Sequence, residues 1–249
     1  MKTKLIPSLA LACSLTCGTS AQTILSDNFN GNTINTNLWQ ASTPFSDSSI
    51  TESGGNAVFQ NRGRLQTAFG LPTGVDITGR FSFVGNSHDS FEISTRTDGI
   101  TSNPYGYFDH GIAFGLSIMG DAGNNSGNVW IIHDGYPGPT EYDLARGTFS
   151  LTQNTFYNFR ITDDGNNLAF FVGDLTTPLL TAIDSSIYGN LIGILNREGS
   201  GGGSTISAGS VVQLDFLTVQ AIPEPSTSIL ALVGGLGVYG LRWRKNKSV

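Results

Sequence analysis

The apolar positions between Gln22 and Ile222 recur with a period of two, which marks β-strands with one buried face. The alternation is clearest in Phe81–Val84, Phe91–Thr95 and Ile112–Ile118. In the third stretch every second residue is large and apolar, whereas most of the residues between are small. No stretch of this region combines a helical period with capping residues. The pattern therefore predicts an all-β domain.

One hairpin can be read directly from the sequence. Tyr157–Ile161 and Leu168–Val172 both alternate, and the turn sequence DDGN at 163–166 separates them. The apolar residues of both arms are expected to share one core face. The last strand is predicted at Val211–Val219, with Val212, Leu214 and Phe216 on its core face before the pattern switches. Roughly 12 to 14 short strands in one domain indicate two packed antiparallel sheets, rather than a small barrel.

Charge is distributed unevenly along the chain. All four lysines, Lys2, Lys4, Lys245 and Lys247, lie near its ends. Residues 22–222 carry 18 aspartates and glutamates against 7 arginines, a net charge of −11. Such a domain is a poor partner for nucleic acid or anionic lipid, so neither is expected. Acidity suits exported material or contact with cations, although aspartate-glycine turns account for much of it.

The N-terminus reads as a signal peptide over residues 1–21. Two lysines are followed by the mostly apolar run Leu5–Leu15, and Thr19-Ser20-Ala21 forms a small-residue cleavage site. Both cysteines, Cys13 and Cys17, lie in this leader, so the mature chain is expected to hold no disulfide and no thiolate metal site. Lipidation at either cysteine is the alternative, but neither has the leucine three positions earlier that a lipobox uses.

Residues 223–249 have three parts in a fixed order. Pro223-Glu224-Pro225 opens the segment, an apolar run from Ser228 to Leu241 follows, and Arg242–Lys247 is basic. The segment resembles the PEP-CTERM sorting signal of Gram-negative bacteria. The resemblance implies transient anchoring in the inner membrane, then recognition and removal of the tail by an exosortase near the Pro-Glu-Pro motif. We therefore expect an exported protein of the cell surface or extracellular matrix.

The length of the apolar run agrees with that reading. Residues 228 to about 243 approach the shortest length that spans a bilayer as a helix, because Arg242 can snorkel. The basic end favours a cytoplasmic C-terminus. A buried helix of the domain is the alternative, but Gly234, Gly235, Gly237 and Gly240 disfavour a soluble helix.

A second resemblance covers the domain itself, residues 22–222. Asp27–Gly31 (sequence DNFNG) followed by Leu38-Trp39 is similar to the opening of concanavalin A-like lectin/glucanase (laminin G-type) jelly rolls. The hairpin at 156–172 and the closing stretch Leu214–Val219 resemble that family's late strands. The resemblance implies a two-sheet antiparallel jelly-roll sandwich in which the first and last strands lie side by side.

The same family often holds calcium where its first and last strands meet. The resemblance makes Asp27 and Asp215 the matching carboxylates, to be completed by backbone carbonyls and water. A turn-capping Asp27 and a solvent-facing Asp215 are the alternative. Glucanases of the family use a Glu-x-Asp-x-Glu strand, whose spacing puts all three carboxylates on one face. That string is absent and the four glutamates of the domain are isolated, so no enzyme is expected.

Aromatic residues near loops are candidates for stacking on sugars. Tyr105, Tyr107, Asp109 and His110 lie in a stretch that Asn103-Pro104 marks as a loop, and we predict a glycan-binding site there. Trp39 and Trp130 are expected in the core. Each of the three histidines adjoins an aspartate, but adjacent side chains of an extended chain point oppositely, so turn or edge positions are favoured over a metal site.

Two functions remain from the sequence. One is a non-enzymatic exported protein whose jelly roll binds extracellular polysaccharide or serves as structural material. The other is a hydrolase or lyase acting on that polysaccharide, with an acid and a base drawn from separate strands.

Overall fold

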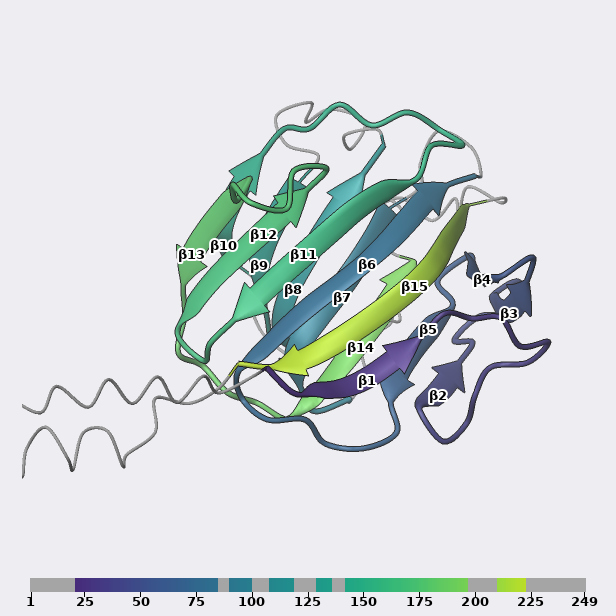
Figure 1. Cartoon of the computed structure of the whole chain (residues 1–249), viewed down its shortest axis with the longest axis horizontal. Coiled ribbons are helices and arrows are strands. Elements are labelled where there is room, and N and C mark those ends of the chain that lie inside the picture. The colour runs from purple at the N-terminus through teal and green to yellow at the C-terminus, as the bar shows by residue number, and fades with distance from the viewer. Residues whose placement is uncertain are drawn as a thin grey trace, which may run out of the picture.

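The computed structural model describes residues 21–84, 90–99, 108–118, 129–135, 142–196 and 210–222, and these form two antiparallel sheets packed face to face (Figure 1). The eight-stranded sheet contains, in order, β13 (Leu180–Ile183), β12 (Asn167–Val172), β11 (Tyr157–Asp163), β6 (Val75–Phe83), β15 (Val211–Ala221), β4 (Asn56–Gln60) and β3 (Ser49–Ser53), with β1 (Thr23–Asp27) also paired to β15. The seven-stranded sheet contains β10 (Tyr142–Gly147), β9 (Val129–Gly135), β8 (His110–Ser117), β7 (Ser90–Thr97), β14 (Leu191–Asn196), β5 (Arg64–Thr67) and β2 (Trp39–Ser42). The predicted all-β, two-sheet sandwich is confirmed.

The predicted hairpin and the closure of the domain are both present. Phe159 pairs with Val172 and Ile161 with Phe170 across β11 and β12, and all four are buried. The first strand, β1, lies beside the last, β15, as the resemblance implied. Gln22 also accepts a backbone hydrogen bond from Ala221, so the two ends of the sandwich meet (Figure 1).

The last strand differs from its prediction at one position. Val212 and Leu214 face the core as expected, but Phe216 does not, and Leu217 and Val219 take over the inner face. The register of β15 against β6 shifts between Leu214 and Phe216, which leaves Asp215 as the extra residue of a bulge. A bulge reverses the phase of alternation, and that explains the switch in the sequence pattern.

Aromatic rings join the two sheets at their centre. Phe81 of β6 stacks on Phe91 of β7 with ring centroids 5.3 Å apart, and Phe159 of β11 lies 6.0 Å from both. A Cβ at Gly79 would lie 2.5 Å from the Phe159 ring, so this position must stay without a side chain. Rings in these offset and edge arrangements add about 0.5–1.5 kcal/mol per pair beyond their burial.

A buried ion pair joins the sheets at one end of the sandwich. Arg96 of β7 has a left-handed backbone with φ of 55°, beside a register shift in the pairing of β7 with β14. This turns its guanidinium inward, onto the carboxylate of Asp163 in β11. The hydroxyl of Thr95 donates to the same carboxylate at 2.6 Å. The side chains of Arg96 and Asp163 are 2% and 0% exposed, so the pair is fully shielded from water.

The two targeting segments fall outside this description. Residues 1–20 of the predicted signal peptide lie outside the described residues, as do the sorting motif Pro223, Glu224, Pro225 and the apolar run after it. Within the described ranges, no helix is both long and apolar enough to cross a membrane.

Removing one partner of the buried ion pair should destabilise the fold strongly. Asp163→Ala leaves a buried guanidinium uncompensated and should cost about 3–5 kcal/mol of unfolding free energy in urea titrations. The control is Asp143→Ala, which breaks the Arg146–Asp143 pair whose side chains are 47% and 49% exposed, and should cost less than about 1 kcal/mol. Equal urea midpoints for the two variants would contradict this account.

Candidate functional site

The outer face of the seven-stranded sheet, which points away from the other sheet, carries two rows of side chains. Strand pairing aligns the first row in the order Ser42, Arg64, Leu195, Glu92, Gly115 and Trp130. The second row runs parallel to it and consists of Gln40, Gln66, Gly193, Ser94, Ala113 and Ile132. Because neighbouring strands lie about 4.8 Å apart, each row extends over roughly 24 Å.

Glu92 is the carboxylate at the centre of the first row. Its side chain is buried, and Oε2 lies 3.4 Å from the indole Nε1 of Trp130. The Trp130 ring lies over Gly115, where an added Cβ would overlap it. The missing side chain at Gly115 therefore lets an indole from β9 reach across β8 to a carboxylate on β7.

The two tryptophans assigned to the core have different positions. Trp39 is 1% exposed and belongs to the main core between the sheets, as expected. Trp130 is 8% exposed, but it packs with Ala113 and Ile132 in a small separate cluster on the outer face. The expectation that Trp130 belongs to the main core is therefore wrong.

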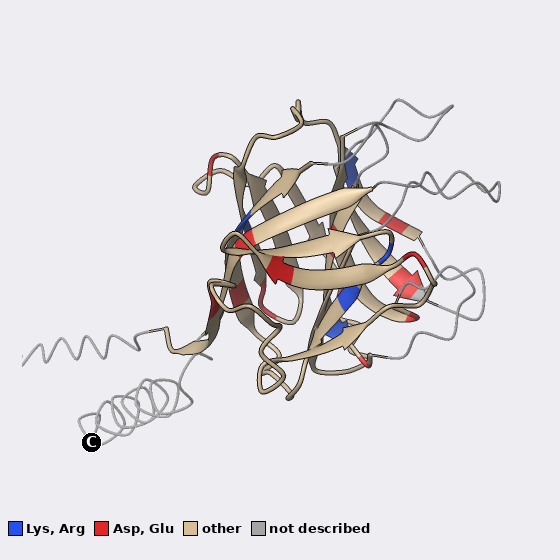
Figure 2. Ribbon diagram, turned by 90° about the vertical axis from the view of Figure 1, so that its right-hand side faces the viewer, with Lys and Arg blue, Asp and Glu red and all other residues tan. Residues whose placement is uncertain are grey.

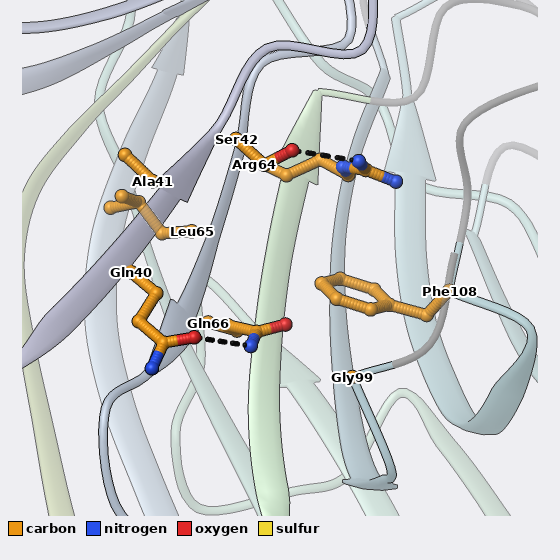
Figure 3. Close-up of a pocket in the computed structure, with 8 residues that line it drawn as sticks. All are labelled: Gln40, Ala41, Ser42, Arg64, Leu65, Gln66, Gly99 and Phe108. Carbon is orange, nitrogen blue, oxygen red and sulfur yellow. Dashed lines mark hydrogen bonds between the residues drawn. The ribbon is translucent and has the colours of Figure 1, made fainter. Parts of the chain in front are cut away.

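A pocket of about 200 Å³ opens over β2 and β5 on this face (Figure 3). Its walls are Gln40, Ala41, Ser42, Arg64, Leu65, Gln66, Gly99 and Phe108. Gln66 Nε2 donates to Gln40 Oε1 at 2.8 Å, and Arg64 donates to the Ser42 hydroxyl at 2.8 Å. The Phe108 ring packs over Gly193, where a Cβ would overlap it. The pocket thus combines amide, guanidinium and hydroxyl groups with one aromatic wall.

The surroundings of Arg64 change the pKa of its guanidinium. Burial lowers the pKa of Arg64, and the negative charge of Asp109 partly offsets that effect. Asp109, predicted as glycan-binding, is itself buried and thus contributes to the electrostatics of this pocket. Its predicted neighbours do not all join it: His110 bonds to Asp98 at the end of the sandwich, and Tyr105 and Tyr107 lie outside the described residues.

Neither the string that begins at Glu92 nor the combination of Glu92 with Asp134 gives the carboxylate spacing of a glycosidase on the outer face. Ser94 and Arg96 occupy the second and third positions of the period-two string that begins at Glu92, and Arg96 is turned inward. Asp134 pairs with Gly111, four residues along β8 from the Gly115 that pairs with Glu92. That offset alone is roughly 13 Å, wider than the roughly 5–9.5 Å that acid and base carboxylates need.

The two carboxylates predicted for calcium lie on paired strands but point to opposite faces. Asp27 pairs with the core residue Leu217, and its two oxygens accept hydrogen bonds from the Phe29 amide at 2.9 Å and the Trp39 indole at 2.8 Å. Asp215 forms an ion pair with the outward-facing Arg80 at 2.6 Å. The bulge at Asp215 accounts for the divergence, and these two side chains do not converge on one ion.

Glu52 of β3 is the carboxylate that does lie near Asp27. It is 9% exposed, and its Oε2 has no hydrogen-bond partner in the structure. Burial and the charge of Asp27 raise the pKa of Glu52, against a backbone hydrogen bond from Gly31 that lowers it. Across the described ranges no three histidine, cysteine or acidic side chains are grouped for a metal, so backbone and amide oxygens would have to complete a calcium shell here.

Comparisons with known proteins bear on the fold. No protein-family model matches the chain, and no curated protein sequence matches it. Solved structures do match: an endo-acting O-glycanase of the human gut microbiota has a TM-score of 0.59 at 11% identity, covering 81% of this chain and 100% of that one. The structural neighbours are concanavalin A-like jelly-roll domains.

Other concanavalin A-like neighbours include both enzymes and binding modules. The catalytic domain of an endo-1,3-β-glucanase (laminarinase) from Thermotoga petrophila has a TM-score of 0.54 at 15% identity, covering 82% of this chain and 99% of that one. The carbohydrate-binding module CBM66 from Bacillus subtilis has a TM-score of 0.54 at 10% identity, with 74% and 98% covered. At these identities the likeness establishes the fold, and it leaves carbohydrate binding and hydrolysis both open.

Sequence reasoning missed most of this face. Glu92 was noted only as an isolated glutamate, and Arg64, Gln40 and Gln66 were not singled out. A signal was present for Glu92, because it alternates with Phe91 and Ile93 on a strand whose apolar residues face the core. The cross-strand neighbours carry no local signal, since residues as far apart as Gln66 and Gly193 meet only through sheet order.

An added methyl group at Gly115 should displace the Trp130 ring. Gly115→Ala is expected to cost about 1–3 kcal/mol through overpacking and to shift tryptophan fluorescence towards the exposed value. The control is the double variant Gly115→Ala/Trp130→Ala, in which the alanine at 115 should cost much less than in the Trp130 background. An additive double-mutant cycle would show that the ring does not lie over Gly115.

Proposed function

We propose that the protein binds a carbohydrate on the outer face of its seven-stranded sheet and does not hydrolyse it. The observation that carries the proposal is the pair of rows on that face. Sugar hydroxyls both donate and accept hydrogen bonds, and the rows contain amides at Gln40 and Gln66, a guanidinium at Arg64 and the buried carboxylate of Glu92. The aromatic side chains Phe108 and Trp130 flank these polar groups.

The make-up of β7 supports a role without hydrolysis. A retaining glycosidase needs two carboxyl groups about 5–5.5 Å apart, and an inverting one needs about 6.5–9.5 Å. At the positions that would supply a second carboxylate on this strand, the chain has Ser94 and Arg96. Arg96 moreover stabilises the fold through Asp163, so this part of the strand serves structure rather than catalysis.

The proposed setting is outside the cell. The signal-peptide pattern at residues 1–21 and the PEP-CTERM-like segment with Pro223-Glu224-Pro225 support export, exosortase sorting and a final place at the cell surface or in the matrix. Extracellular polysaccharide is then the natural ligand class. Figure 2 marks the acidic and basic positions along the ribbon, and the net charge of −11 over residues 22–222 favours neutral over anionic sugars.

Binding is tested with the purified full chain on a glycan array, followed by calorimetry on the strongest saccharide. Gln66→Ala removes a hydrogen-bonding amide and Glu92→Gln removes the negative charge of an acceptor, so each should weaken binding roughly tenfold. The control Gln213→Ala makes the same kind of change on the outward side of the eight-stranded sheet, where Gln213 lies between the core residues Val212 and Leu214. It should bind like the wild type.

Reducing ends released from the bound saccharide would overturn the non-enzymatic part of the proposal and favour a hydrolase. Unsaturated products would favour a lyase. If none of the outer-face variants changed the affinity, the ligand would have to bind elsewhere on the protein.

We further propose a calcium ion between Asp27 and Glu52, close to the strand junction that the sequence indicated. Glu52 and Asp27 are neighbouring carboxylates, and the buried Glu52 Oε2 has no hydrogen-bond partner, which fits a divalent cation. The ion would tie the loop after β1 to the β3–β4 hairpin. Its contribution would be to stability, since these residues lie on the other sheet from the proposed carbohydrate face.

Calcium at a hundredfold excess over its Kd should raise the melting temperature by roughly 5–10 °C relative to EGTA. Glu52→Gln should abolish that increase. In EGTA at pH 7 the same variant should be more stable than the wild type, because a raised pKa means that stability is present at low pH and is lost as Glu52 ionises. An unchanged calcium effect in Glu52→Gln would contradict the site.

A further inference from the structure

Two tyrosines and two histidines form a ring cluster at the end of the sandwich that the Arg96–Asp163 pair closes. This tyrosine–histidine cluster consists of His110, His133, Tyr142 and Tyr188. The rings of His133 and Tyr142 are stacked with centroids 4.7 Å apart and planes 17° apart. His110 and Tyr188 are stacked at 5.2 Å and 18°, and His133 meets Tyr188 edge-on at 5.2 Å.

Hydrogen bonds fix the orientation of every ring in the cluster. The Tyr188 hydroxyl bonds to His133 Nε2, and the Tyr142 hydroxyl donates to Asp184 Oδ2 at 3.3 Å. His110 Nδ1 lies 3.0 Å from Asp98 Oδ2. Burial and the nearby Asp184 carboxylate raise the pKa of Tyr142, so its hydroxyl stays protonated and remains a donor.

The loop that supplies Tyr188 is itself anchored. Arg96 donates to the backbone oxygens of Asp184 at 2.7 Å and Ser186 at 3.0 Å. The Ser186 amide donates to Asp184 Oδ1 at 2.6 Å. Burial raises the pKa of Asp184, but this bond, the His133 charge and the Tyr142 hydroxyl outweigh it and hold that pKa below its ordinary value. Asp184 is therefore ionised at neutral pH and accepts hydrogen bonds.

The rings are rigid but not covered. Tyr142 is 48% exposed and Tyr188 is 40% exposed, although each is backed by a stacked histidine. Among the described residues, five large apolar side chains are exposed. Four of them lie in the cluster or close to it in the chain: Tyr142, Ile183, Ile187 and Tyr188. Aromatic rings held open in one orientation have already lost the freedom that binding would otherwise remove.

We propose that this cluster is a second carbohydrate subsite, in which the free face of Tyr142 stacks on a neutral sugar ring. The carboxylates of Asp184 and Asp98 at its rim accept hydrogen bonds from the sugar hydroxyls, and their charge disfavours anionic sugars. This inference rests on the proposed carbohydrate binding and extends it. The cluster begins at His110, about five residues or roughly 17 Å along β8 from Gly115. His133 pairs with the core residue Ile112, so the cluster lies on the core-facing side of the sheet at its end, whereas Trp130 and Glu92 lie on the outer face.

A subsite at that distance makes affinity depend on ligand length. A disaccharide occupies one site at a time, whereas a hexasaccharide that passes around the end of the sheet can engage both. The probes are laminaribiose and laminarihexaose, with cello- and xylo-oligosaccharides of the same two lengths. Binding to the full chain is measured by calorimetry, and the Tyr142 and Tyr188 ring signals are followed by NMR with labelled tyrosine.

The decisive variants are Tyr142→Ala and Tyr142→Phe. Tyr142→Ala should weaken hexasaccharide binding roughly 3- to 10-fold, since stacking contributes about 0.5–1.5 kcal/mol. Disaccharide binding at the outer face should not change. Tyr142→Phe keeps the ring over His133 and should bind within about twofold of the wild type.

Three outcomes would overturn the subsite. Wild-type affinity of Tyr142→Ala for every hexasaccharide, with Glu92→Gln still impaired, removes the subsite and leaves the proposed function standing. Equal losses in Tyr142→Ala and Tyr142→Phe show that stacking is not the interaction. A change of oligomeric state in Tyr142→Ala, seen by light scattering, assigns the exposed rings to contact between copies. If no probe binds the wild type or shifts its tyrosine signals, both proposals fail.

Discussion

The buried contact between Arg96 and Asp163 is the interaction on which the arrangement of this molecule depends. It joins the middle of one sheet to the middle of the other, and it requires the left-handed backbone that turns Arg96 out of the outer face. The same guanidinium holds the backbone of Asp184 and Ser186, and through them the loop that carries Tyr188. Because a buried charge without its partner is costly, this pair of side chains couples the two sheets and the loop at this end of the sandwich.

Turning Arg96 inward has a consequence for chemistry. In a catalytic carboxylate string, acidic residues would occupy every second position of β7 from Glu92 onward. Here the next such position is Ser94, and the one after it is Arg96, whose side chain points into the interior. On β7 itself, Glu92 is then the one carboxylate of the outer face. The strand does not supply a second carboxylate at the spacing of a glycosidase pair, and Arg96 stabilises the fold instead.

The sequence predicts the elements of the fold well because alternation is a local property. The strands around Ile112 and the hairpin at 157–172 follow from residues read in order, whereas the pairing of β1 with β15 was implied by the resemblance to the jelly-roll family. Two bulges lie beyond that reading: the one at Asp215 separates it from Asp27, and the one at Arg96 separates it from Glu92. The site itself is non-local. The charge of Asp27 acts on Glu52, and Tyr188 forms a hydrogen bond with His133, only because the fold brings distant segments together. The spacing of these residues in the sequence predicts neither interaction.

The use of arginine links stability to ligand choice. Each of the six arginines in the described ranges is already engaged: Arg80, Arg96, Arg146 and Arg160 pair with aspartates, Arg64 donates to Ser42, and Arg62 lies over the Phe45 ring. With no lysine between residues 22 and 222, these contacts leave little positive charge for a ligand, while carboxylates such as those of Asp47, Asp164 and Asp174 are exposed. A polyanion approaching this domain meets repulsion that salt only partly screens. A neutral glycan meets none, and a calcium ion is attracted. Because the arginines are used in contacts within the domain, the remaining negative charge disfavours anionic ligands and favours neutral ones or cations.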